Sequence, residues 1–170
     1  REAIRIMTDL VQQYGYASSG ESFSIADPNE AWIMEMIGKG TGNRGAVWVA
    51  VRIPDDCIAA HANQSRIHKF NMDDKENVMY ASDVISFARE KGYFNGVNKD
   101  FDFANTYNPL DFGGLRYCEA RVWSFYNRYT NRGAEFLPYI LGNSSEPMPL
   151  YVKPNKKLTL QDVQNMMRDH

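Results

Sequence analysis

The sequence lacks the features that mark a disulfide-rich protein, a nucleic-acid-binding protein or a membrane protein. Its 170 residues include only 2 cysteines, Cys57 and Cys118, which are too few for a disulfide framework. The 19 basic and 21 acidic residues leave a net charge of −2, and there is no basic block of the kind that binds nucleic acid or a membrane surface. No apolar run approaches the roughly 20 residues that a membrane span requires. We therefore expect neither nucleic acid nor a membrane as a partner.

Complete catalytic and metal-binding motifs are absent as well. The sequence has no G-x-S-x-G elbow, no phosphate-binding glycine loop, no H-E-x-x-H and no paired C-x-x-C. His61 and His68 precede Asp73 and Asp74 without the ligand spacing of a zinc site. Residues 98–105, rich in Asn and Asp, lack the glycine and the glutamate of an EF-hand calcium loop. We therefore expect no metal and no cofactor.

Cys57 and His61 resemble a nucleophile and its base, but they lie four positions apart on an expected strand. Residues so spaced share a face of the strand and stand about 13 Å apart, which is too far for a direct hydrogen bond. Cys57 and Cys118 both lie in apolar patterns, so each is expected to be a buried small hydrophobic residue. The residues alone therefore predict no complete catalytic constellation.

Alternating side chains in residues 22–63 predict an antiparallel meander. The expected strands are Ser22–Ala26, Ala31–Ile37, Ala46–Ile53 and Cys57–Ala62. Turn residues Asp27-Pro28-Asn29 follow the first strand, and the glycine-rich residues 38–45 predict a flexible hairpin loop. Both faces of the sheet are largely apolar, so both must be covered by other elements. This pattern predicts an α+β fold with layers of helices on an antiparallel sheet.

Helical spacing predicts four helices. They comprise residues 4–14, Asp83–Lys91 with Ser82 as its cap, Leu115–Tyr129, and a final helix capped by Thr159 and Asp162. In the third helix the apolar stripe leaves Arg121 half-buried and Arg116 near the opposite side. In the final helix Val163, Met166 and Met167 are expected to face inward. Residues 93–113 and 137–155 are expected to be irregular or extended.

Four segments resemble the dipeptidase A and secernin family of cysteine peptidases, in the versions found in Bacteroides-type gut bacteria. The matching segments are Ala17–Glu35, Trp48–Asp56, His61–Ile67 and Leu115–Phe125. The resemblance implies the α-β-β-α sandwich of the N-terminal-nucleophile hydrolases, and covers essentially all 170 residues. No capping residue stands before Arg1. We therefore expect residues 1–170 to be a single domain that is a truncated portion of a larger catalytic domain.

The resemblance also implies a catalytic apparatus. Its nucleophile is a cysteine at the first position of the mature enzyme, with the free amine as base, which belongs upstream of Arg1. The 170 residues alone are then expected to be inactive. Asn63 is similar to a strand-end amide that stabilises the oxyanion. Arg116 or Arg121 is similar to a helix arginine that lowers the pKa of the nucleophile. Glu30, Glu35 and Arg66 match the family without an assigned role.

The expected partner of the parent protein is a dipeptide substrate. Two alternatives stay open, namely an acylase or amidase of the wider N-terminal-nucleophile group and a non-catalytic binding or structural module. A severed sandwich also predicts a homo-oligomer formed through the exposed sheet surface.

Overall fold

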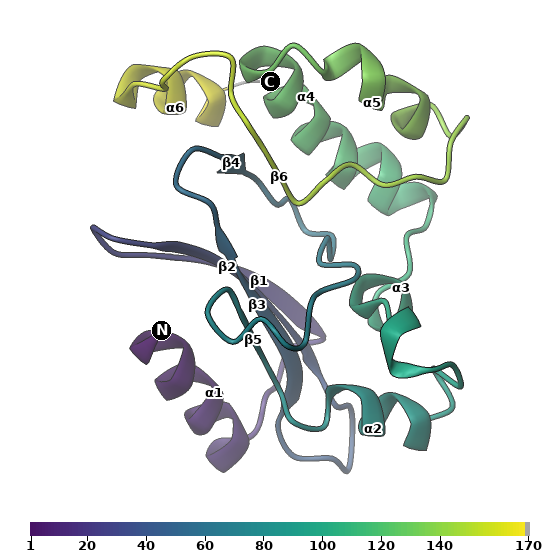
Figure 1. Ribbon diagram of the computed structural model, residues 1–170. Helices are drawn as coiled ribbons and strands as arrows, with labels where there is room; N and C mark the ends of the chain where they lie inside the picture. Colours follow the sequence, from purple (N-terminus) through teal and green to yellow (C-terminus); the bar gives the residue numbers. More distant parts are fainter. Residues whose placement is uncertain (169–170) are drawn as a thin grey trace. The chain divides into compact units, whose positions relative to one another are not determined.

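The computed structural model describes residues 1–168 and confirms the predicted α+β class (Figure 1). The described chain divides into two compact units. The first unit contains residues 1–55 and 63–110, and the second contains residues 56–62 and 111–168. The first unit holds the main sheet, and the second is mostly helical.

The main sheet consists of four antiparallel strands in the order β1-β2-β3-β5. These strands are β1 (Gly20–Ala26), β2 (Ala31–Gly38), β3 (Ala46–Ile53) and β5 (Val78–Tyr80). The first three confirm the predicted meander. The Asp27 carboxylate accepts hydrogen bonds from the backbone N–H groups of Asn29 (2.7 Å) and Glu30 (3.0 Å), which closes the first turn. Between β2 and β3, Gly40, Gly42 and Gly45 have positive φ angles, as a flexible glycine loop allows.

The prediction for the fourth strand is wrong. Residues 58–59 form β4 (Ile58–Ala59), which pairs with β6 (Tyr151–Val152) in a separate two-stranded sheet of the second unit. The fourth strand of the main sheet is β5, which pairs with β3. Because β5 is short and follows polar turn residues, the alternation of apolar and polar side chains does not identify it.

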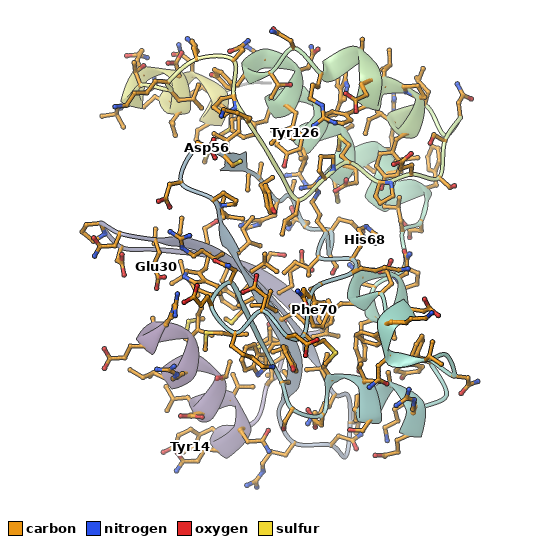
Figure 2. The ribbon with its side chains drawn as sticks, viewed as in Figure 1. Tyr14, Glu30, Asp56, His68, Phe70 and Tyr126 are labelled. Carbon is orange, nitrogen blue, oxygen red and sulfur yellow. The ribbon has the colours of Figure 1, made fainter. Side chains whose placement is uncertain are left out.

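The central strands β2 and β3 are buried on both faces. Helix α1 (Glu2–Tyr14) packs Ile4 against Trp32, Met34 and Met36 of β2. On the opposite face, helix α2 (Val84–Glu90) lies against β3, whose Val47 and Val49 are fully buried. Helix α1 also leaves apolar groups exposed: Tyr14, at its end, is 75% exposed (Figure 2).

The second unit is built on a continuous helical segment. It begins as a π-helical stretch, Gly114–Glu119, and continues as α4 (Ala120–Tyr129), which confirms the predicted extent. The buried residues of α4 are Val122, Phe125, Tyr126 and Tyr129. Helix α5 (Gly133–Ile140) packs beside α4.

Several local predictions are corrected. Helix α5 includes Pro138, so the segment expected to be extended from residue 137 begins inside a helix, whose buried Phe136 and Tyr139 outweigh the missing proline N–H. A short helix, α3 (Phe103–Tyr107), interrupts the expected irregular stretch, after a 3-10 turn at Asn98–Asp100. The N-cap of α2 is Asp83 instead of Ser82.

The final helix, α6 (Leu160–Met167), begins with the predicted capping box of Thr159 and Asp162. Its apolar side chains do not face inward as expected, because none of its residues is buried and Met167 is 74% exposed.

Candidate functional site

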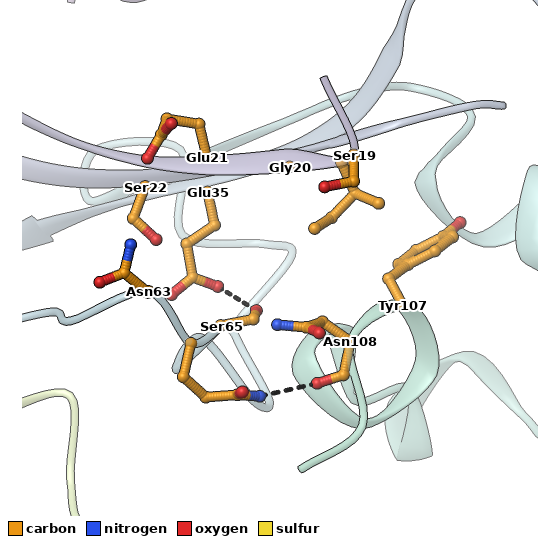
Figure 3. A pocket seen from close by; sticks show the side chains of 11 residues that line it. Ser19, Gly20, Glu21, Ser22, Glu35, Asn63, Ser65, Tyr107 and Asn108 are labelled. Carbon is orange, nitrogen blue, oxygen red and sulfur yellow. Dashed lines mark hydrogen bonds between the residues drawn. The ribbon is translucent and has the colours of Figure 1, made fainter. Parts of the chain in front are cut away.

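A polar pocket of the first unit lies at the end of the main sheet near the start of β1 and has a volume of about 360 Å³. It is lined by residues 19–22 of β1 and its approach, Glu35 and Ile37 of β2, residues 63–65, and Tyr107 with Asn108 at the end of α3. In Figure 3, Ser22 and Glu35 point from the sheet toward Asn63 and Ser65. Ser22 and Glu35 are register partners on β1 and β2, so their side chains leave the same face.

Asn63 lines this pocket and is exposed, as are Ser19 and Glu21. Its backbone has a φ of 65°, the only positive φ of a non-glycine residue among residues 1–168. Asparagine tolerates this left-handed conformation better than most side chains. The sequence therefore turns sharply at Asn63, just before a segment that becomes fully buried at residues 64–67.

Glu35 holds this buried segment. Its side chain is 1% exposed in the middle of β2. The Ser65 hydroxyl donates to Oε2, the backbone N–H of Arg66 donates to Oε1 at 2.6 Å, and the N–H of Ile67 lies 3.2 Å from both oxygens. Burial raises the pKa of Glu35, and these donors and the nearby Arg66 charge lower it by less.

Helix α3 holds the same segment from the other side. The backbone N–H groups of Phe103 and Ala104 donate to the carbonyl oxygens of His68 and Ile67, each at 3.0 Å. The Asp102 carboxylate caps α3 and contacts His68 Nδ1 at 3.0 Å.

The pairing with His68 is one reason why the pKa of Asp102 is lowered in spite of its partial burial. Gln64 Nε2 donates to the carbonyl oxygen of Asn108 at 2.9 Å, which joins residues 63–65 to the end of α3. The pocket is thus framed by hydrogen-bonded backbone on both sides.

Comparisons with known proteins identify the family of the chain. The profile of peptidase family C69 matches residues 1–170. The chain belongs to peptidase family C69. It is 31% identical over 170 residues to the probable dipeptidase of Latilactobacillus sakei, covering all of this chain and 33% of that protein. It is 28% identical over 174 residues to the probable dipeptidase of Salmonella dublin, covering all of this chain and 36% of that protein.

Dipeptidase A of Lactobacillus helveticus is 27% identical over 156 residues, which cover 91% of this chain and 30% of that protein. The chain therefore spans about a third of the length of the curated relatives that it matches.

The predicted arginines of this C69 chain lie in the second unit, whereas Asn63 lies in the first. Arg121 is exposed, so its expected half-burial is wrong. The buried stripe of α4 includes Tyr126, on the side of the helix away from Arg121. The guanidinium of Arg121 donates to the carbonyl oxygens of Tyr117 (2.6 Å) and Ala62 (3.0 Å). Arg121 and Ala62 both belong to the second unit, and Ala62 directly precedes Asn63 in the chain.

Arg116 lies on the π-helical stretch and is exposed. Neither arginine is among the residues that line the pocket.

The expected burial of both cysteines is wrong, because each is only half-buried in the second unit, and neither lines the pocket. Burial, together with the neighbouring Asp56 carboxylate, raises the pKa of Cys57, which reduces its thiolate fraction. The Cys57 thiol donates to Asp56 at 3.6 Å. The geometry therefore gives Cys57 none of the features of an activated nucleophile.

Within residues 1–168, no group of three or more His, Cys, Asp or Glu side chains is arranged to hold a metal ion. No helix in that described range is both long and apolar enough to cross a membrane. His68 and Asp102 have side chains of the kind that bind metals, but here they join α3 to the segment that follows Asn63.

Asn63, predicted from the sequence as an oxyanion donor, lines this pocket, and so does Glu35, for which the sequence predicted no role. Sequence reasoning missed Ser22, Ser65, Tyr107 and Asn108. Ser65 could have been found from its place in the matching segment His61–Ile67, but α3 and its two pocket residues come from a stretch expected to be irregular.

Proposed function

We propose that these 170 residues supply part of the active site of a dipeptidase, and that Asn63 is its oxyanion donor. The relatives named above carry dipeptidase names, and family C69 is a peptidase family. The pocket volume of about 360 Å³ is at the small end of ligand sites, which suits a short substrate better than a long peptide. The observation that carries the proposal is Asn63 itself, an exposed amide on a rigidly held turn at the pocket wall.

An amide N–H₂ group is suited to this role. It is a neutral donor with fixed geometry, and a donor that is already in position stabilises the negative oxygen of a tetrahedral intermediate without reorganisation. The segment that follows Asn63 donates hydrogen bonds to Glu35 and accepts them from α3. These bonds reduce the motion that would weaken such a donor.

The nucleophile in this proposal is a cysteine upstream of Arg1, at the first position of the mature enzyme. Its thiolate attacks the carbonyl carbon of the dipeptide bond and forms a tetrahedral oxyanion that Asn63 stabilises. The terminal amine takes up the thiol proton and returns it to the leaving amine, and water then hydrolyses the thioester. The surroundings of Cys57 support this assignment, because its raised pKa and its Asp56 contact disfavour attack.

The test compares the 170-residue chain with a polypeptide extended upstream to the first cysteine of the mature protein. Both are assayed against a panel of dipeptides and a panel of acylated amines. We expect dipeptide hydrolysis by the extended protein alone. Activity of the short chain by itself would refute the upstream nucleophile, and turnover of acylated amines without dipeptide turnover would refute the dipeptidase proposal in favour of an amidase.

A further inference from the structure

We propose that Glu35 is a positioning residue, whose carboxylate fixes residues 65–67 and thereby keeps the Asn63 amide at the pocket wall. The catalytic readout of this inference rests on the proposed function of Asn63, but the positioning itself is a structural claim.

Glu35 is anchored more firmly than the segment that it holds. It lies on β2, between β1 and β3, with Ser22 and Val49 as its register partners on the two sides. Its backbone is therefore fixed by strand pairing on both edges. Residues 60–77, by contrast, contain no helix or strand, so their path depends on side-chain contacts such as those of Glu35.

The contacts reach the segment at three successive residues. Glu35 accepts from the hydroxyl of Ser65 and from the backbone N–H groups of Arg66 and Ile67. These groups are buried, since Ser65, Arg66 and Ile67 are 7%, 3% and 2% exposed. Without the carboxylate, the two N–H groups would lose their acceptor in a place that water hardly reaches, and the segment would move to satisfy them.

The consequence passes to Asn63 through a short and strained connection. Only Gln64 separates Asn63 from Ser65, and Asn63 has a φ of 65°. A left-handed residue persists when its neighbours hold it in place. Release of residues 65–67 would therefore let Asn63 relax toward negative φ, and the direction of its side chain would change.

Glu35 is one of the residues that line the pocket, but its carboxylate is engaged by residues 65–67, so its proposed role is to act through Asn63. Its side chain is 1% exposed and its oxygens are occupied by the donors of residues 65–67. A group that contacted substrate would leave at least one oxygen directed into open space.

A double-mutant cycle on the extended protein tests this inference. The variants are Glu35→Ala, Glu35→Gln and Asn63→Gly, with Glu35→Ala combined with Asn63→Gly. We expect E35A to lower kcat about 100-fold with little change in KM, because it misplaces an oxyanion donor. In the N63G background, E35A should lower kcat by less than about twofold, since the group that it positions is already absent.

The conservative variant and a matched control sharpen the cycle. A glutamine at position 35 can still accept from the two N–H groups, and its amide can donate to the Ser65 hydroxyl, so E35Q should keep kcat within about fivefold of the wild type. The control is Glu30→Ala, which removes a carboxylate from the residue just before the same strand. Glu30 forms ion pairs with Arg1 at 3.2 Å and Arg52 at 3.8 Å. The E30A substitution should leave kcat unchanged in both backgrounds.

The inference would be overturned if the kcat losses of E35A and N63G multiplied in the double variant, because the two residues would then act independently. If E35A does not fold, Ser65→Ala removes one contact only, and its loss of kcat should likewise disappear in the N63G background. A crystal structure of E35A or S65A supplies a readout that needs no activity: an unmoved Asn63 side chain overturns the positioning role. An active wild type with an unaffected N63G variant refutes instead the proposed function of Asn63.

Discussion

Replacing Asn63 by glycine isolates the contribution of its amide from that of its backbone. At a φ of 65°, glycine is unstrained, whereas alanine would force its Cβ into the left-handed region. Asn63→Gly therefore removes the amide and leaves the turn intact. Asn63→Ala removes the amide and also destabilises the fold by about 1 kcal/mol.

The expected catalytic effect follows from the loss of one oxyanion donor. Such a loss lowers kcat by about 10² to 10³, which corresponds to about 3–4 kcal/mol of transition-state stabilisation. Because the ground-state carbonyl gains little from the donor, KM should change far less than kcat. Asn63→Asp should be at least as inactive, since a carboxylate of the same shape offers no donor and repels the oxyanion.

The assay is steady-state dipeptide hydrolysis by the extended protein, with thermal unfolding of each variant measured in parallel. The glycine variant should unfold near the wild-type temperature, and the alanine variant a few degrees lower. A kcat for N63G within about threefold of the wild type, with a normal unfolding temperature, would refute the reasoning, because no donor loss of this kind costs so little.

Other parts of the chain give further predictions. Cys57→Ser and Cys118→Ser should keep kcat within about twofold of the wild type in the same assay, as expected for half-buried thiols away from the pocket. Arg121→Ala should lower kcat by up to about tenfold, since it removes a hydrogen bond to the residue before Asn63. Arg116→Ala, at an exposed site for which no contact within residues 1–168 is known, is its matched control and should be neutral. The raised pKa of Glu35 means that the native state binds more protons than the unfolded state above about pH 4.3. The stability of the wild type therefore falls as pH rises from about 4.3 through the pKa of Glu35 in the folded state. Over this pH range, calorimetry should show that the unfolding temperature of E35Q rises relative to that of the wild type.

The sequence was sufficient for the parts of the fold that local pattern determines. Alternation defined β2 and β3, because each presents an apolar set to both faces. The glycines of the hairpin and the capping box of Thr159 are equally local signals. The fourth strand failed for the opposite reason: β5 is three residues long, and only its pairing with β3 identifies it.

The candidate site, like the fold, was predictable only in part. Asn63 was predicted because a family resemblance identified a strand-end amide, although the structure shows a left-handed turn in place of a strand end. The contribution of α3 could not be predicted, because Tyr107 and Asn108 reach the pocket only through the docking of α3 onto residues 67–68. Contacts of that kind depend on chain segments more than thirty residues apart in the sequence.

Glu35 shows why a violated local rule is informative. A carboxylate in the middle of an apolar strand, between Met34 and Met36, is unfavourable for strand propensity and costly to bury. A methionine or valine would stabilise the sheet at that position, but it could not accept hydrogen bonds from residues 65–67. The conflict between local preference and native structure therefore lies where the chain needs a fixed acceptor, one residue removed from the turn that carries Asn63. The other buried residues of β2 are all apolar. Replacing Glu35 is therefore expected to lower kcat through the position of Asn63, while the apolar residues of the strand continue to form the core.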